Sequence, residues 1–197
     1  MGHSWRTRAG QVSHPHNQDA FLTQLSQELR SENAATVLLA LEDLERQGPL
    51  PQEGWSLRGK ALMLQHQPEN ALASLKAGLA AHPSSVVLRL NLAAAHLALG
   101  EALKALELLE PLELSPTEEF QRRAALLRNR ARAAAQCGQH SLAVRDLEVL
   151  RQLEGESEGL LWSLAQAYEQ VGALDKAALL YRLILRKPEE VILRESS

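Results

Sequence analysis

The chain has 197 residues, of which 45% are hydrophobic and only 4% aromatic, and a composition rich in leucine and alanine favours helices over sheets. Its 21 basic and 24 acidic residues give a formal net charge of −3, which excludes a field that would draw the whole chain onto nucleic acid or an anionic membrane. Cys137 is the only cysteine, which excludes an internal disulfide. No apolar run is long enough to span a bilayer, so we expect a soluble, cytoplasmic protein.

The N-terminal segment, residues 1–16, contains glycine, proline, histidine and arginine without an apolar period, and we expect it to be a flexible tail. From Asn17 onward apolar residues recur three or four positions apart, the spacing of one helix face. Glycine and proline interrupt this pattern at 48–54, 67–68, 82–84, 100, 115–116, 138, 155–159, 172 and 188. These breaks predict ten helices of about 11 to 16 residues.

The predicted helices repeat in pairs. Small residues recur at intervals of 34, 38 and 34, and a large residue follows each of them four positions later. Such a period is typical of stacked helical hairpins, in which a small residue allows two helices to cross closely. The small residues are Ala71, Ala105, Ala143 and Ala177, and the large residues are Leu75, Leu109, Leu147 and Tyr181.

The last unit, SEGLLWSLAQAYEQVGALDKAALLYRLILRKPE, resembles the tetratricopeptide repeat. Its pattern residues are Leu164, Ala165, Tyr168, Gly172, Ala177, Tyr181 and Pro188. Three preceding units match less fully, and 17–47 resembles a degenerate first unit. The resemblance implies an all-α fold, a right-handed solenoid of about five antiparallel helix pairs over residues 17–188. We expect residues 189–197 to form a short C-terminal tail.

The known catalytic and metal-binding patterns, such as HExxH, CxxC, GxxxxGK and GxSxG, do not occur in the sequence. His96 and His140 are isolated from acidic partners at ligand spacing, and acidic residues such as Asp146 are expected on solvated outer faces. Cys137 is expected to be a small buried hydrophobe. We therefore predict no catalytic residue, no metal, no cofactor and no enzymatic activity.

Five arginines lie between Arg122 and Arg132, without acidic residues four positions away. In the resembled family the first helix of each unit lines a concave groove, and Arg128 and Arg132 share one helix face. An exposed Trp162 could anchor a partner there, and its packing into the core is the alternative. A plain solvated face is the alternative for the arginines. The candidate partner-binding groove comprises Lys60, Asn91, Arg128, Asn129, Arg132, Trp162 and Gln166.

These observations favour an adaptor that binds a protein or peptide segment, with acidic residues in the partner as one expectation. The alternative is a helical-repeat RNA-binding protein that uses the arginine run; the net charge and the scarcity of aromatic residues disfavour it. At the C-terminal end, Leu174, Ala178 and Leu185 face a missing neighbour. We expect either that 191–193 fold back over them or that two copies dimerise there.

Overall fold

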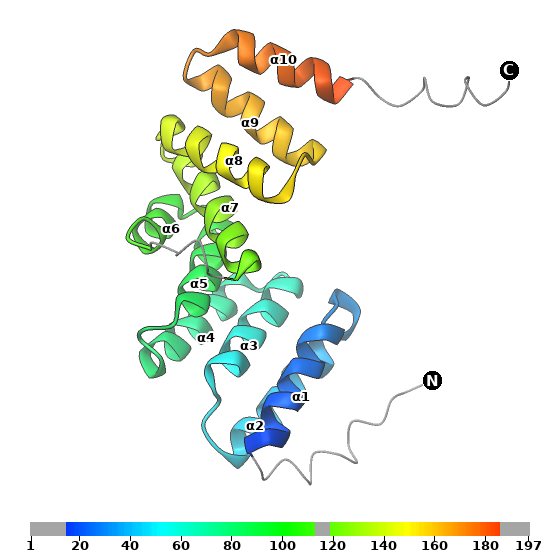
Figure 1. Ribbon diagram of the computed structural model, residues 1–197. Coiled ribbons are helices and arrows are strands. Elements are labelled where there is room, and N and C mark those ends of the chain that lie inside the picture. Colours follow the sequence, from blue (N-terminus) through cyan, green and yellow to red (C-terminus); the bar gives the residue numbers. More distant parts are fainter. Residues whose placement is uncertain (1–14, 113–118, 186–197) are drawn as a thin grey trace, which may run out of the picture. The chain divides into compact units, whose positions relative to one another are not determined.

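The computed structural model describes residues 15–112 and 119–185. In these ranges it contains ten α-helices, one short 3-10 helix and no β-strand, which confirms the predicted all-α fold. The chain divides into two compact units, the first ending at Leu112 and the second beginning at Glu113. Each unit is built from consecutive helices joined by short turns (Figure 1).

The first unit, called unit 1, contains three helix pairs. Its helices are α1 (Pro15–Glu28), η3 (Ser31–Asn33), α2 (Ala34–Gln47), α3 (Gln52–Leu64), α4 (Pro68–Ala81), α5 (Val86–Ala98) and α6 (Ala102–Leu109). Leucines of α1, α2 and α3 form one core cluster, and a second cluster joins α4 to α5. Helix α1 begins at Pro15, two residues before the helical region that the sequence predicts, and residues 1–14 lie outside the described part.

The second unit, called unit 2, contains two helix pairs, α7 (Phe120–Gln136) with α8 (His140–Glu154) and α9 (Glu158–Gln170) with α10 (Leu174–Leu185). Helix α8 also packs against α9, so the two hairpins stack. Helix α7 has 17 residues and α6 only 8, beyond the lengths that the sequence predicts. The extra residues expected near 115–120 lie mostly outside the described part, as do residues 189–197.

The repeat pattern read from the sequence is confirmed by burial and by backbone angles. Ala71, Ala105 and Ala143 are fully buried, and Ala177 is 3% exposed, as the close helix crossings require. The turn glycines Gly138 and Gly172 both have φ of 77°, a left-handed conformation that side chains disfavour and that ends the first helix of each hairpin.

Three predictions about single residues are wrong or only partly right. Asp146, expected on a solvated face, is 1% exposed. His96, expected to lack an acidic partner, is 4% exposed, and its Nδ1 lies 2.6 Å from Oε2 of Glu101. Cys137, expected to be buried, is half-buried. The acid contacts arise where one helix or turn meets the next, which the pattern within a single helix does not indicate.

Candidate partner-binding site

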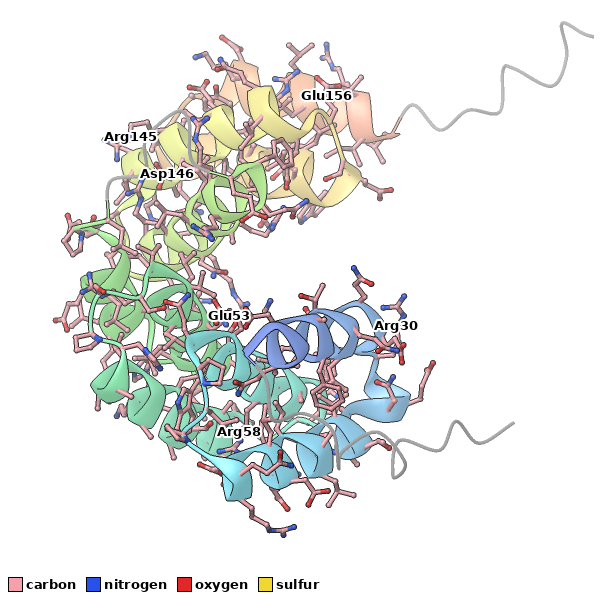
Figure 2. All side chains as sticks on the ribbon, turned by 60° about the horizontal axis from the view of Figure 1, so that its bottom comes forward. Arg30, Glu53, Arg58, Arg145, Asp146 and Glu156 are labelled. Carbon is pink, nitrogen blue, oxygen red and sulfur yellow. The ribbon has the colours of Figure 1, made fainter. Side chains whose placement is uncertain are left out.

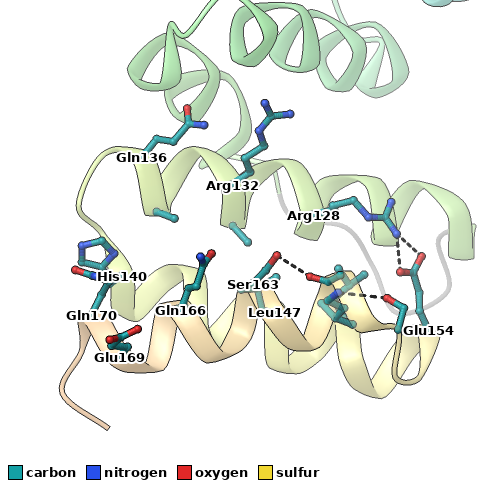
Figure 3. A pocket seen from close by; sticks show the side chains of 17 residues that line it. Arg128, Arg132, Gln136, His140, Leu147, Glu154, Ser163, Gln166, Glu169 and Gln170 are labelled. Carbon is teal, nitrogen blue, oxygen red and sulfur yellow. Dashed lines mark hydrogen bonds and ion pairs between the residues drawn. The ribbon is translucent and has the colours of Figure 1, made fainter. Parts of the chain in front are cut away.

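Unit 2 contains a pocket of about 720 Å³ between its two first helices, α7 and α9, with α8 behind them (Figure 3). Its floor consists of small and aliphatic side chains, whereas its rim is polar. This combination of an apolar interior and a few polar groups is typical of binding pockets. The apolar lining residues are Ala131, Ala135, Leu147, Leu150, Gly159, Leu160 and Ala167, and the polar lining residues are Arg128, Arg132, Gln136, His140, Glu154, Ser157, Ser163, Gln166, Glu169 and Gln170.

One end of the pocket is closed by an ion pair between α7 and α8. Nη2 of Arg128 lies 2.7 Å from Oε1 and 2.5 Å from Oε2 of Glu154, as the dashed lines in Figure 3 show. From the sequence, the charge of Arg128 is expected to lack an acidic partner, because Glu154 is 26 residues away, on the next helix. That part of the prediction is wrong: Arg128 already has a carboxylate partner.

Other rim side chains keep their hydrogen-bonding groups available. Among the residues that the structure describes, none bonds to the side chains of Arg132, Gln136, Gln166 or Gln170. Figure 3 shows Gln166 reaching from α9 into the pocket, whereas Arg132 and Gln136 extend from the rim on α7. Because a glutamine amide both donates and accepts, these groups can bond to the N–H and C=O groups of an incoming backbone.

The remaining arginines of α7 have structural contacts. Arg130 Nε lies 2.6 Å from Oδ2 of the buried Asp146, and its Nη2 lies 3.0 Å from Oδ1. Asp146 lies inside unit 2, whereas Arg145 stands at its outer edge (Figure 2). Nε of Arg122 is 3.4 Å from Oε2 of Glu119. Asn129, which the sequence places in the groove, does not line the pocket and is half-buried.

Trp162 lies outside this pocket, although its side chain is 48% exposed. Its ring is edge-on to that of Tyr181 on α10, with centroids 5.3 Å apart. The Tyr181 hydroxyl donates to Oε2 of Glu169 at 3.1 Å, and burial together with this hydrogen bond raises the pKa of Tyr181. Trp162 therefore packs against α10 and does not line the pocket that contains Gln166 and Arg132.

Unit 1 has a second pocket, of about 470 Å³, again lined by its first helices. Lys60 and Asn91, both predicted from the sequence, line it together with Leu29, Met63 and Leu75. Nδ2 of Asn91 donates to Oγ of Ser56 at 2.8 Å, so this amide is partly engaged. The exposed Lys60 ammonium has no such partner in the described part of the chain, which leaves one cation beside an apolar pocket.

The sequence missed several residues of the pocket in unit 2. Gln136 and Gln170 both line it and stand 34 residues apart, which is the repeat interval. Comparing equivalent positions of successive units would therefore have identified them. Glu154 and His140 carry no such signal, because they enter the pocket from α8.

Within the residues described, no group of three or more histidine, cysteine or acidic side chains is placed to hold a metal ion. No described helix is both long and apolar enough to cross a membrane. Neither pocket is lined by a phenylalanine, tyrosine or tryptophan. The described pockets therefore offer hydrogen bonds, charge and apolar surface, and they lack the stacking platforms that recognise nucleic acid bases.

Stacked helical hairpins in a regular register define a helical-repeat protein, a class that generally binds other proteins. Residues 62–131 match the model of the tetratricopeptide repeat family. The resemblance to the tetratricopeptide repeat that the sequence predicts is thus confirmed over these residues. No curated protein matched the chain in sequence.

Solved structures of tetratricopeptide proteins are similar over most of the chain. PilF of Pseudomonas aeruginosa has a TM-score of 0.71 at 14% identity, over 85% of this chain and 74% of that one. MamA of Desulfovibrio magneticus RS-1 has a TM-score of 0.67 at 17% identity, over 85% of this chain and 93% of that one. MamA of strain AMB-1 has a TM-score of 0.64 at 16% identity, over 93% of this chain and 100% of that one. At these identities the likeness shows the fold alone.

Proposed function

We propose that the chain is a non-catalytic, cytoplasmic adaptor that binds an extended segment of a partner protein in the pocket between α7 and α9. One observation carries the proposal: beside an apolar floor, the rim side chains of Arg132, Gln136, Gln166 and Gln170 make no hydrogen bonds to the described residues. Burying such groups without partners costs free energy, so a ligand that offers matching donors and acceptors is favoured. A polypeptide backbone offers both at every residue.

The floor sets the size of the side chain that the partner inserts. Ala131, Ala135 and Ala167 leave room between the helices, and Leu147 and Leu150 close the bottom. This surface fits an aliphatic side chain, and its burial supplies most of the affinity. Gln166 and Gln170 on one side and Gln136 on the other bond to the backbone of the segment.

Arg132 gives the partner segment a preferred charge. Because Arg128 is held by Glu154, we assign the recognition of an acidic residue to Arg132, whose guanidinium can bind a carboxylate through two parallel hydrogen bonds. Such exposed ion pairs contribute about 0 to 1 kcal/mol, so Arg132 selects among partners more than it holds them. The pocket with Lys60 and Asn91 in unit 1 is proposed as a second contact for the same class of partner.

Affinity capture with a filled pocket tests the proposal. Ala135 is exposed and lines the pocket, so Ala135→Trp occupies the pocket while leaving the core intact. Ala77, an exposed alanine of α4, gives the matched control Ala77→Trp. We expect the same partner proteins to be recovered with the wild type and with Ala77→Trp, and to be lost with Ala135→Trp. Equal recovery with both variants contradicts the proposal, and loss of all material after nuclease treatment favours the RNA alternative.

A further inference from the structure

Helix α10 carries an apolar stripe on its exposed side. Leu174, Ala178, Tyr181 and Leu185 are spaced four, three and four residues apart, which places them on one helix face. Leu174 is 63% exposed and Leu185 is 77% exposed. Trp162 extends the stripe through its edge contact with the ring of Tyr181. We call this surface the end face, formed by Trp162, Leu174, Ala178, Tyr181 and Leu185.

The equivalent faces of α4 and α8 are covered by the next first helix. On α4 the residues that correspond to Ala178, Tyr181 and Leu185 are Leu72, Leu75 and Leu79, three repeat intervals earlier. There, Leu75 is fully buried, because it packs in one core cluster with residues of α5. These residues are Leu88, Leu92 and Ala95. On α8 the residue equivalent to Tyr181, Leu147, is only 7% exposed, and α8 packs against α9.

The end face is more apolar than the equivalent internal face in unit 2. Where α8 has His140 and Arg151, α10 has Leu174 and Leu185. Where α7 has Arg128, α9 has Trp162. The solvated end of a repeat stack is ordinarily polar, and a contiguous apolar surface on a folded protein marks an interaction site. The end face therefore has apolar residues where the internal face has polar ones, which is the difference expected of an interface.

We propose that the end face binds an amphipathic helix of a partner protein, seated on α10 as α5 is seated on α4. The chemistry of that helix follows from α5, whose Leu88, Leu92 and Ala95 pack on the equivalent face. The partner presents two large apolar residues four positions apart and a small residue three positions further on. This surface is distinct from the pocket between α7 and α9, and its role does not depend on the function proposed for that pocket.

The sequence disfavours two other occupants. In residues 186–197 the aliphatic residues Val191, Ile192 and Leu193 are consecutive, so on a helix they would spread around the axis instead of lining one stripe. In a second copy stacked head to tail, α1 would have to cover the end face. The exposed residues of α1 include Asp19, Thr23 and Gln27, which are polar.

The test uses the full chain and a synthetic peptide that copies residues 85–99, which contain α5 and no tryptophan. Peptide affinity is measured by fluorescence anisotropy for the wild type and two double variants. The end-face variant is Leu174→Glu with Leu185→Glu. The matched control is Leu179→Glu with Leu183→Glu, two exposed leucines on another face of the same helix.

We expect the wild type and the control to bind the peptide with equal affinity. The affinity of the end-face variant should be lower by a factor of about ten or more. Binding should also protect tryptophan fluorescence from acrylamide in the wild type, and this protection should be absent in Trp162→Phe. Equal affinities for the three proteins, or the lack of saturable binding to the wild type, would overturn the proposal.

Two further results would assign the end face to a different occupant and also overturn the proposal. The first is a wild-type dimer in light scattering that the end-face variant dissociates, because a second copy then covers the face. The second concerns the full chain with Val191→Asp, Ile192→Asp and Leu193→Asp. If acrylamide quenches Trp162 more strongly in this variant without peptide, residues 191–193 already cover the face. A monomeric wild type with unchanged quenching in that variant supports a helix supplied by another protein.

Discussion

The two units place an arginine at the same repeat position and use it differently. Arg58 of unit 1 and Arg130 of unit 2 stand 72 residues apart, two repeat intervals. The guanidinium of Arg130 binds the buried Asp146 of α8. The equivalent residue on α4 is Ser74, and there Arg58 instead pairs with Glu45 at 2.7 Å and lies over the ring of Trp55, 5.1 Å from its centroid.

This difference shows that the same repeat scaffold can have different interior contacts in its two units. The repeat register fixes the position of the arginine on its helix. One residue on the next helix then decides which group the guanidinium binds. In unit 1 the hydroxyl of Ser74 is buried and has no hydrogen-bond partner in the described part of the chain. In unit 2 the same position joins α7 to α8 through a charged pair.

The largest effect is expected for Asp146→Ala, which removes the carboxylate that Arg130 binds. Removal of one partner of a buried ion pair costs about 3 to 5 kcal/mol, because the remaining charge stays poorly solvated. The free energy of unfolding, measured in urea, should fall by that amount. The control is Arg145→Ala: Arg145 also approaches Asp146, at 3.6 Å, but its side chain is 67% exposed, so its loss should cost at most about 1 kcal/mol. Equal losses for the two variants would contradict a buried pair.

Alkaline pH should destabilise unit 2 selectively, because both tyrosines of the chain, Tyr168 and Tyr181, lie there. The pKa of Tyr168 is raised to about 12, mainly by burial. The hydrogen bond that its hydroxyl donates to Glu148 is the second cause. A folded-state pKa above the ordinary value of 10.0 means that stability is fully present below pH 10 and is lost as the pH rises toward 12. The expected loss is roughly 2 kcal/mol.

The measurement is the unfolding free energy of the wild type and of Tyr168→Phe across that pH range. Tyr168→Phe removes the ionisable hydroxyl, so its alkaline decline should be shallower. Parallel declines for the two proteins would show that Tyr168 does not cause the pH dependence.

The next effect concerns Gly78 of α4, which contacts Trp55 of α3. A Cβ at position 78 would lie 2.7 Å from Cβ and 2.8 Å from Cγ of Trp55, so the indole must shift. We expect Gly78→Ala to cost about 1 to 2 kcal/mol in thermal or urea unfolding, after the better helix propensity of alanine is counted. At Gly159 of α9 nothing lies within 4 Å of an added Cβ, so Gly159→Ala should leave stability unchanged or raise it. A stabilised Gly78→Ala protein would show that the contact is loose.

Both units use a serine to begin a helix, which allows a matched test. The Ser85 hydroxyl accepts from the N–H of Leu88 at 3.2 Å, and that of Ser157 accepts from the N–H of Leu160 at 3.3 Å. Substitution of such caps by alanine costs about 1 kcal/mol. Ser85 is 4% exposed whereas Ser157 is exposed, so Ser85→Ala should lower the unfolding free energy more than Ser157→Ala. The reverse order would indicate that water replaces the cap at position 85.

The smallest effect is expected for Ser74→Ala. Because the hydroxyl of Ser74 is buried without a partner in the described part of the chain, its removal should be neutral or stabilising by up to about 1 kcal/mol. Urea unfolding of Ser74→Ala beside Asp146→Ala measures the asymmetry between the units directly. If Ser74→Ala instead lowers the unfolding free energy, the hydroxyl of Ser74 makes a stabilising hydrogen bond, which contradicts this prediction.

The sequence predicts the fold well because the fold depends on local spacing. Ala143 and Ala177 recur at the repeat interval, and Gly138 and Gly172 end helices at the expected places. The site is harder to predict, because its contacts join residues of different helices. Glu154 meets Arg128 across 26 residues, and Asp146 meets Arg130 across 16.

Trp162 shows the same limit. Its offset in the repeat pattern predicts exposure, and the side chain is indeed 48% exposed. The direction of the ring depends on Tyr181, 19 residues later, and no local pattern predicts that contact. Periodicity thus identifies which side chains are exposed, whereas the packing of neighbouring helices decides which surface they form.

The most direct test of the proposed partner pocket is photo-crosslinking from inside it. A benzophenone amino acid is placed at Gln166, which lines the pocket, or at Gln152, which is exposed on α8 and does not line it. After irradiation in native extract, we predict that one set of proteins is crosslinked from position 166 and not from position 152, and that Ala135→Trp suppresses it. Equal crosslinking from both positions, or crosslinking from position 166 that Ala135→Trp leaves unchanged, would contradict a partner segment bound in the pocket between α7 and α9.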